Sequence, residues 1–202
     1  MKQRVARALL VLSALSRAAA AQRQVSQVRD RFADLPEARL DSLYGPLLYL
    51  MHPDERGVYP ALSVSGKRDY LRRFWARRDP SPTTPQNEVE DGFYARVSEA
   101  NRRFHEGGAG AIPGWRTDRG RIFISYGPPD DVLSRPQLGP TLPYEVWKYT
   151  RGRGRTVRKF CFVDLTRFGN YVLVYAADAA EASQPSWRQL LGREAYEQVL
   201  RF

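Results

Sequence analysis

Residues 144–176, YEVWKYTRGRGRTVRKFCFVDLTRFGNYVLVYA, decide the fold class of this 202-residue chain. Three runs within them are rich in the β-branched and aromatic residues that favour strands: Tyr144–Thr150, Val157–Asp164 and Tyr171–Ala176. Loops that carry glycine or asparagine separate these runs, and no helical segment intervenes. A similar run precedes them at Arg121–Tyr126. The sequence therefore predicts an antiparallel sheet of about four consecutive strands.

Helices are predicted on both sides of the strand region. Ser65 is expected to cap one helix and Thr84, followed by Pro85, to cap another. The second of these carries an apolar stripe that includes Phe93, with Glu90 on the opposite face. The expected helices lie at residues 35–43, 53–62, 65–78, 84–104 and 187–202. Together they predict an α+β fold in which N-terminal helices pack on an antiparallel sheet of about four strands, with a C-terminal helix added.

The first 21 residues have the order of an export signal. Basic residues come first, an apolar run follows at residues 8–16, and small residues follow at Ala18–Ala21. We expect cleavage after Ala21, which would place the mature protein in the periplasm or outside the cell. Arg17 interrupts the apolar run, so an uncleaved membrane anchor stays open as the alternative.

The remaining chain divides into three predicted parts. A polar and partly helical lead-in covers residues 22–44, an α+β domain covers residues 45–180, and an amphipathic helix covers residues 181–202. Cys161, the single cysteine, lies in an alternating apolar stretch, which predicts a buried side chain rather than a nucleophile.

The formal net charge of +10 suggests an anionic partner, but the predicted leader carries part of it. Loss of its four basic residues would lower the charge to +6. The densest basic segment, Arg151–Lys159, lies between two predicted strands. A solvated hairpin loop is the simpler interpretation of this segment, and a patch that binds polyanions is the alternative.

The stretch Gly114-Trp-Arg-Thr-Asp118 resembles the name-giving motif of the GWxTD domain family. Further motifs of that family are recognisable in order along the chain: Phe74-Trp75 with Arg78-Asp79-Pro80, Asp118-Arg-Gly-Arg-Ile122, and Tyr126-Gly-Pro-Pro-Asp130. The resemblance runs from about residue 45 to residue 176. It makes the following residues candidates for function: Trp75, Arg78, Asp79, Asn87, Glu88, Asn101, Trp115, Thr117, Asp118, Arg119, Tyr126, Asp130, Glu145 and Trp147.

The resemblance implies an exported bacterial protein without an established activity, so it supplies no catalytic residues. The sequence has no Gly-x-Ser-x-Gly elbow and no phosphate-binding loop. His52 and His105 lack the spacing of a zinc site, and we predict no metal and no cofactor.

These observations favour a non-catalytic binding or structural module of the cell envelope, with another envelope protein or a surface component as its partner. No transmembrane span is expected after leader cleavage, and nucleic acid is not the expected partner. One alternative is a carboxylate-based or cation-dependent hydrolase that uses the motif acids. The other alternative is polyanion binding through Arg151–Lys159.

Overall fold

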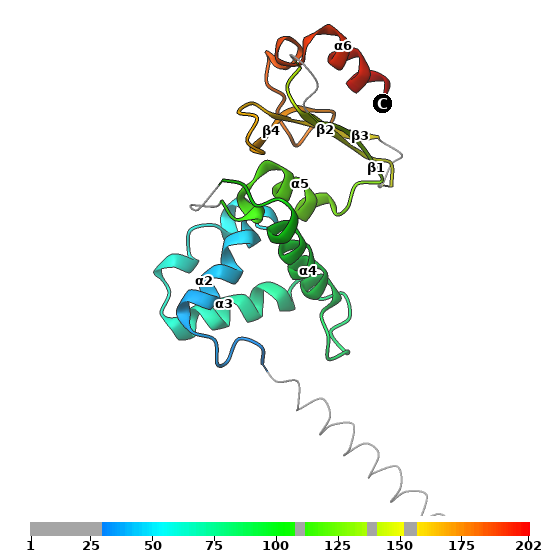
Figure 1. The fold of residues 1–202 in the computed structure, drawn as a ribbon. Coiled ribbons are helices and arrows are strands. Elements are labelled where there is room, and N and C mark those ends of the chain that lie inside the picture. The colour runs from blue at the N-terminus through cyan, green and yellow to red at the C-terminus, as the bar shows by residue number, and fades with distance from the viewer. Residues whose placement is uncertain (1–29, 108–111, 137–140, 152–156) are drawn as a thin grey trace, which may run out of the picture. The chain divides into compact units, whose positions relative to one another are not determined.

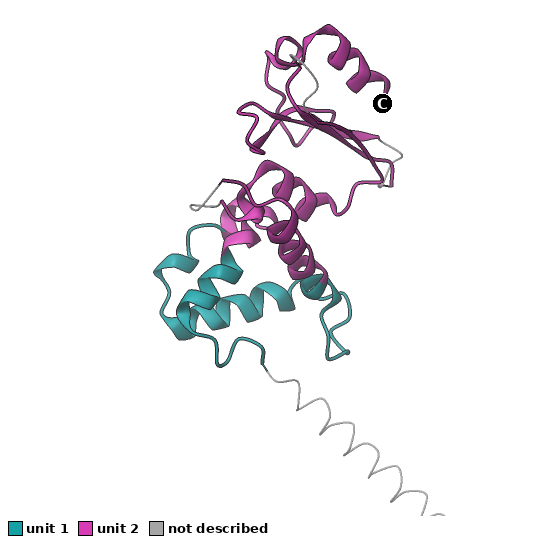
Figure 2. Ribbon diagram, viewed as in Figure 1, with its two compact units in different colours: residues 1–44, 56–91 teal, residues 45–55, 92–202 magenta. Residues whose placement is uncertain are grey.

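A computed structural model describes residues 30–107, 112–136, 141–151 and 157–202 (Figure 1). The predicted export signal and the centre of the basic loop lie outside these ranges. Within them, no helix is long and apolar enough to cross a membrane. The chain forms two compact units, one from residues 1–44 and 56–91 and the other from residues 45–55 and 92–202 (Figure 2).

The first unit is helical. It contains α2 (Glu37–Tyr44), the short 3₁₀ helix η3 (Tyr59–Ala61), α3 (Val64–Ala76) and the first turn of α4 (Glu88–Arg103). Lys67 ties α3 to α2, because its Nζ donates to the carboxylates of Glu37 (2.7 Å) and Asp41 (2.8 Å). The buried side chains of this unit include Leu40, Tyr59, Leu71, Phe74 and Trp75.

Two helix starts differ from the prediction. Ser63, not Ser65, caps α3, and its Oγ accepts a hydrogen bond from the Gly66 amide (3.2 Å). The α4 helix begins at Glu88, because the Asn87 side chain accepts from the Glu90 amide (3.1 Å). The Thr84 hydroxyl instead donates to nearby carbonyls of the preceding loop. In both places a second short polar residue competed for the capping position.

The predicted helix at residues 53–62 is wrong. This segment holds two separate 3₁₀ turns, η2 (Pro53–Glu55) and η3. Gly57 between them has a φ of 88°, outside the helical region. Pro60 lacks the N–H that a helix interior needs, so a continuous helix could not form through it.

The second unit contains the predicted sheet. Its strand order is β1-β2-β3-β4, and every neighbouring pair is antiparallel. The α+β class, the four-stranded sheet and the C-terminal helix are confirmed. The strands are β1 (Asp131–Arg135), β2 (Tyr144–Tyr149), β3 (Arg158–Asp164) and β4 (Tyr171–Ala176).

The first predicted strand, at Arg121–Tyr126, is wrong. These residues belong to the helix α5 (Asp118–Tyr126), and Asp131–Arg135 takes the first place in the sheet instead. Thr117 caps α5 by accepting from the Gly120 amide (3.1 Å). The cap and the burial of successive apolar residues override the strand propensity of this short run.

Helices cover both faces of the sheet (Figure 1). On one face, α6 (Trp187–Arg201) packs over a buried cluster that includes Tyr144, Val163 and Cys161. On the other face, α5 contacts β4, and the Trp147 ring lies 5.2 Å, between centroids, from the ring of Phe104, which follows α4 directly. The strand aromatics therefore form core. Cys161 is fully buried, and burial raises its thiol pKa to about 12, which makes it unreactive, as expected for a structural cysteine.

Candidate functional site

The turn that carries the GWxTD motif is held from both sides by side chains of the second unit. Residues Gly114–Arg116 form the 3₁₀ helix η4, and α5 follows after Thr117. The Trp115 amide donates to the Asn101 carbonyl oxygen Oδ1 (3.0 Å), and the Trp115 carbonyl accepts from the Tyr49 hydroxyl (2.7 Å). The backbone of the motif thus has a fixed position against α4 and the segment around Tyr49.

Asp118 accepts a hydrogen bond from β4, the strand at one edge of the sheet. Strand β4 lies at that edge, so the outward backbone groups of β4 need partners from outside the ladder. The Leu173 amide donates to Asp118 Oδ2 (2.7 Å), and the Tyr171 amide donates to Glu106 Oε1 (3.0 Å). Ser183 accepts from the Ala176 amide on the same strand (3.0 Å). The motif aspartate therefore serves as an acceptor for edge-strand amides.

Arg119 lies in a largely buried charge cluster next to that edge. Its guanidinium contacts Glu106 (3.3 Å) and Glu145 (3.6 Å) and lies over the Tyr171 ring at 3.9 Å. Only 12% of the Arg119 side chain and 7% of the Glu106 side chain are exposed. Burial raises the pKa of Glu106, although the Tyr171 amide and Arg119 act in the opposite direction. Glu145 also accepts from the Trp147 indole N–H (3.1 Å), so the cluster pins α5 to β2 and β4.

Two further motif residues of the second unit, Asp130 and Tyr126, make local structural contacts. Asp130 accepts from the amides of Thr150 (2.6 Å) and Arg151 (3.0 Å), and these bonds lower its pKa. Tyr126 ends α5 with its ring 5.0 Å from that of Phe160, between centroids. Both residues fix local structure, one at the start of β1 and one in the core.

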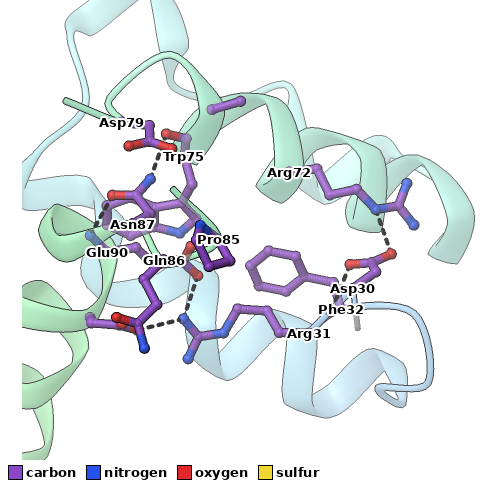
Figure 3. Close-up of a pocket in the computed structure, with 12 residues that line it drawn as sticks. Asp30, Arg31, Phe32, Arg72, Trp75, Asp79, Pro85, Gln86, Asn87 and Glu90 are labelled. Carbon is purple, nitrogen blue, oxygen red and sulfur yellow. Dashed lines mark hydrogen bonds and ion pairs between the residues drawn. The ribbon is translucent and has the colours of Figure 1, made fainter. Parts of the chain in front are cut away.

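A pocket of about 400 Å³ lies in the first unit (Figure 3). Three predicted residues line it: Trp75, Asp79 and Asn87. Asn87 links the loop to α3, because its Nδ2 donates to the Trp75 carbonyl (2.9 Å) while its Oδ1 caps α4. The Asp79 carboxylate accepts from the Ser81 amide (2.9 Å) in the turn that follows α3.

Glu90 is the pocket residue that the sequence placed wrongly. It was expected on the outer face of its helix, yet only 8% of its side chain is exposed. Burial raises its pKa to about 7; the nearby Asp91 and Asp79 act in the same direction, and Arg31 opposes them. The covering segment contains Arg31 and Phe32, and neither carries a local sequence signal that would predict this position. A buried carboxylate on a polar helix face can be recognised only when the covering segment is placed.

The sequence profile of the GWxTD domain matches residues 10–190, which is most of the chain. This chain belongs to the GWxTD domain family. No curated protein and no solved structure matches it.

In this GWxTD protein the candidate residues fall into two sets. Trp75, Asp79 and Asn87 belong to the pocket of the first unit, where Glu88 is exposed and Arg78 stacks on the Phe74 ring at 3.7 Å. The second unit contains the hydrogen-bonded and aromatic set. That set is Asn101, Trp115, Thr117, Asp118, Arg119, Tyr126, Asp130, Glu145 and Trp147.

The structure shows no ready metal site among the residues it describes, where no group of three or more His, Cys, Asp or Glu side chains could hold an ion. The motif acids of the second unit have separate partners: Asp118 pairs with β4, Asp130 with the residues after β2, and Glu145 with Arg119. We therefore do not propose the hydrolase alternative.

The described ends of the basic loop are also engaged within the chain. Arg151 pairs with Asp130 (2.5 Å), Arg158 pairs with Asp178 (2.6 Å), and Lys159 Nζ donates to the Leu200 carbonyl (2.9 Å). Residues 152–156 lie outside the described ranges. The described basic groups thus have partners within the chain, and we do not propose polyanion binding.

An Asp118→Ala variant is expected to lose about 1–2 kcal/mol of unfolding free energy, because the Leu173 amide loses its acceptor. Urea denaturation measures this loss, and amide hydrogen exchange at Leu173 locates it. Asp118→Asn keeps a carbonyl oxygen in the same place and should lose less. Unchanged exchange at Leu173 in Asp118→Ala would contradict the assigned role.

Proposed function

We propose that this GWxTD protein is an exported, non-catalytic module of the periplasm or cell envelope that binds a protein or cell-surface partner. The observation that carries the proposal is the use of the motif acids. Asp118, Asp130 and Glu145 accept hydrogen bonds from the chain's own amides and indole. A catalytic carboxylate must reach the reacting atoms, whereas these groups are occupied by the fold.

The turn between β3 and β4 offers a surface for such a partner. Phe168 is 86% exposed at this turn, and Arg167 next to it has a φ of 63°, which is unusual for a residue with a side chain. The Asp164 carboxylate holds the turn by accepting from the amides of Gly169 (2.6 Å) and Thr166 (3.2 Å). Burial alone would raise the pKa of Asp164, but these hydrogen bonds lower it. An aromatic residue on a turn whose backbone is already held loses less backbone entropy on binding, which favours its use as an anchor.

A photo-crosslinking amino acid at position 168 tests the proposal in cells that express the full chain. We expect a discrete light-dependent adduct in the envelope or periplasmic fraction when the crosslinker replaces Phe168. The same amino acid at Val58, an exposed apolar position of the first unit, is the matched control and should give no such adduct. A cytoplasmic location of the chain, or identical adduct patterns at both positions, would contradict the proposal.

Enzymatic turnover would also contradict it. The decisive result would be hydrolysis by the purified protein that Asp118→Asn abolishes while the unfolding free energy stays within about 1 kcal/mol of wild type.

A further inference from the structure

The pocket of the first unit has an acidic lining in a basic chain. Its acids outnumber its bases by four to two, whereas the whole chain has a formal net charge of +10. Part of this lining is internally paired, since Asp30 contacts Arg72 (2.7 Å) and Asp91 contacts Arg31 (3.1 Å). The titratable residues of the lining are Asp30, Arg31, Arg72, Asp79, Glu90 and Asp91.

Glu90 gives the pocket its chemistry. Its Oε1 is buried and forms an ion pair with Arg31 Nη1 (2.9 Å), but this contact lacks the alignment of a good hydrogen bond. The same Arg31 nitrogen donates instead to Asp91 (3.1 Å). A buried carboxylate oxygen with a poorly aligned donor is costly, and a ligand that supplies a well-aligned N–H would relieve that cost.

Apolar groups lie beside the carboxylate. The lining includes Phe32, Trp75, Ala76 and Pro85, and Figure 3 shows the Phe32 ring directed towards Pro85 in the middle of the pocket. Such a surface suits a hydrocarbon stem that ends in a compact charged group. An ammonium group fits this description, since it has three donors on one small centre and a flexible alkyl stem.

We propose that this pocket binds a primary alkylammonium group, with Glu90 as the carboxylate that accepts its hydrogen bonds. The group can come from a free diamine or from the side chain of a peptide lysine. Arg31 keeps Asp91 as its partner when the ligand takes Glu90. This binding goes beyond the proposed partner interaction and does not depend on it, because it uses the first unit alone.

Binding should strengthen as the pH rises through 7. The carboxyl of Glu90 titrates near that value, and only its ionised form attracts the cation. The charged groups that face Glu90 are Arg31 from the segment before α2, Asp79 from the turn after α3 and Asp91 from α4 itself. Guanidinium groups do not titrate near neutral pH, so the pH dependence reports on the carboxyl.

Calorimetric titration of the full chain with cadaverine and with Nα-acetyl-lysine amide tests the proposal. At pH 8 we expect saturable binding of at least one probe, and at pH 6 at least threefold weaker binding. Glu90→Gln should weaken binding at pH 8 at least tenfold. Glu88→Gln, on the same helix but exposed and outside the pocket, should leave the affinity within twofold of wild type. Tighter binding of cadaverine would identify a free diamine as the ligand class, and tighter binding of the lysine amide would identify a peptide side chain.

Two results would overturn the proposal: no saturable binding of either probe to the folded wild-type chain at pH 8, or equal binding by wild type and a folded Glu90→Gln variant. If Glu90→Gln does not fold, the wild-type titrations at pH 6 and pH 8 decide. Equal affinity at the two pH values would then exclude Glu90 as the acceptor. 1-Pentanol, which has the same stem length without the charge, should not bind, and binding equal to that of cadaverine would show that the charge is not recognised.

Discussion

A Gly114→Ala variant is expected to lose about 3 kcal/mol of unfolding free energy. A Cβ atom at this position would lie 1.9 Å from the Ala100 carbonyl oxygen and 2.8 Å from the Asn101 Cα. Both are backbone atoms of α4, and they cannot move aside by a side-chain rotation. The first glycine of the motif therefore allows the motif turn to touch the helix backbone directly. Guanidinium denaturation of the purified chain measures the loss.

Gly92→Ala is the matched control, because it adds the same methyl group within α4, the helix whose backbone Gly114 touches. The nearest atom to its new Cβ is the tip of the Arg96 side chain, 3.8 Å away. Alanine is the better residue in a helix interior, so we expect a gain of about 0.5–1 kcal/mol. The two substitutions should have opposite signs. Similar effects at both positions would contradict a close approach of backbones at Gly114.

The unfolding free energy of the wild-type chain is expected to fall between pH 5 and pH 8 relative to that of Glu90→Gln. The pKa of Glu90 is about 7 in the folded chain and ordinary, near 4.5, in the unfolded one. Between these values the folded state binds more protons, so its stability decreases as the pH rises. At about 1.4 kcal/mol for each pKa unit, the change is on the order of 3 kcal/mol.

Urea denaturation at several pH values gives this difference. Glutamine has nearly the shape of the protonated carboxyl and does not titrate, so its curve supplies the reference. Glu88→Gln removes an exposed carboxyl at the first residue of the same helix, two positions before Glu90. Its curve should follow that of the wild type. Parallel curves for wild type and Glu90→Gln would show that Glu90 has an ordinary pKa and would remove the electrostatic basis of the pocket.

Local pattern was sufficient for part of the fold. Strands β2, β3 and β4 and the helix α6 lie where the sequence placed them, because their periodicity and turn residues agree with the tertiary packing. The run Arg121–Tyr126 was misassigned because a six-residue run with four apolar or aromatic residues suits either a strand or a short helix. The Thr117 cap and the contact with the sheet decided between them.

The sequence by itself determined the α+β class, the family and the burial of Cys161, since each follows from residue order or from short-range alternation. Only the tertiary structure decided what the polar residues do. Asp118 accepts from Leu173, 55 positions along the chain, and Glu90 is buried by Arg31 and Phe32, about 60 positions before it. Hydrogen bonds and desolvation act between neighbours in space, and such neighbours are brought together by packing that no local pattern specifies.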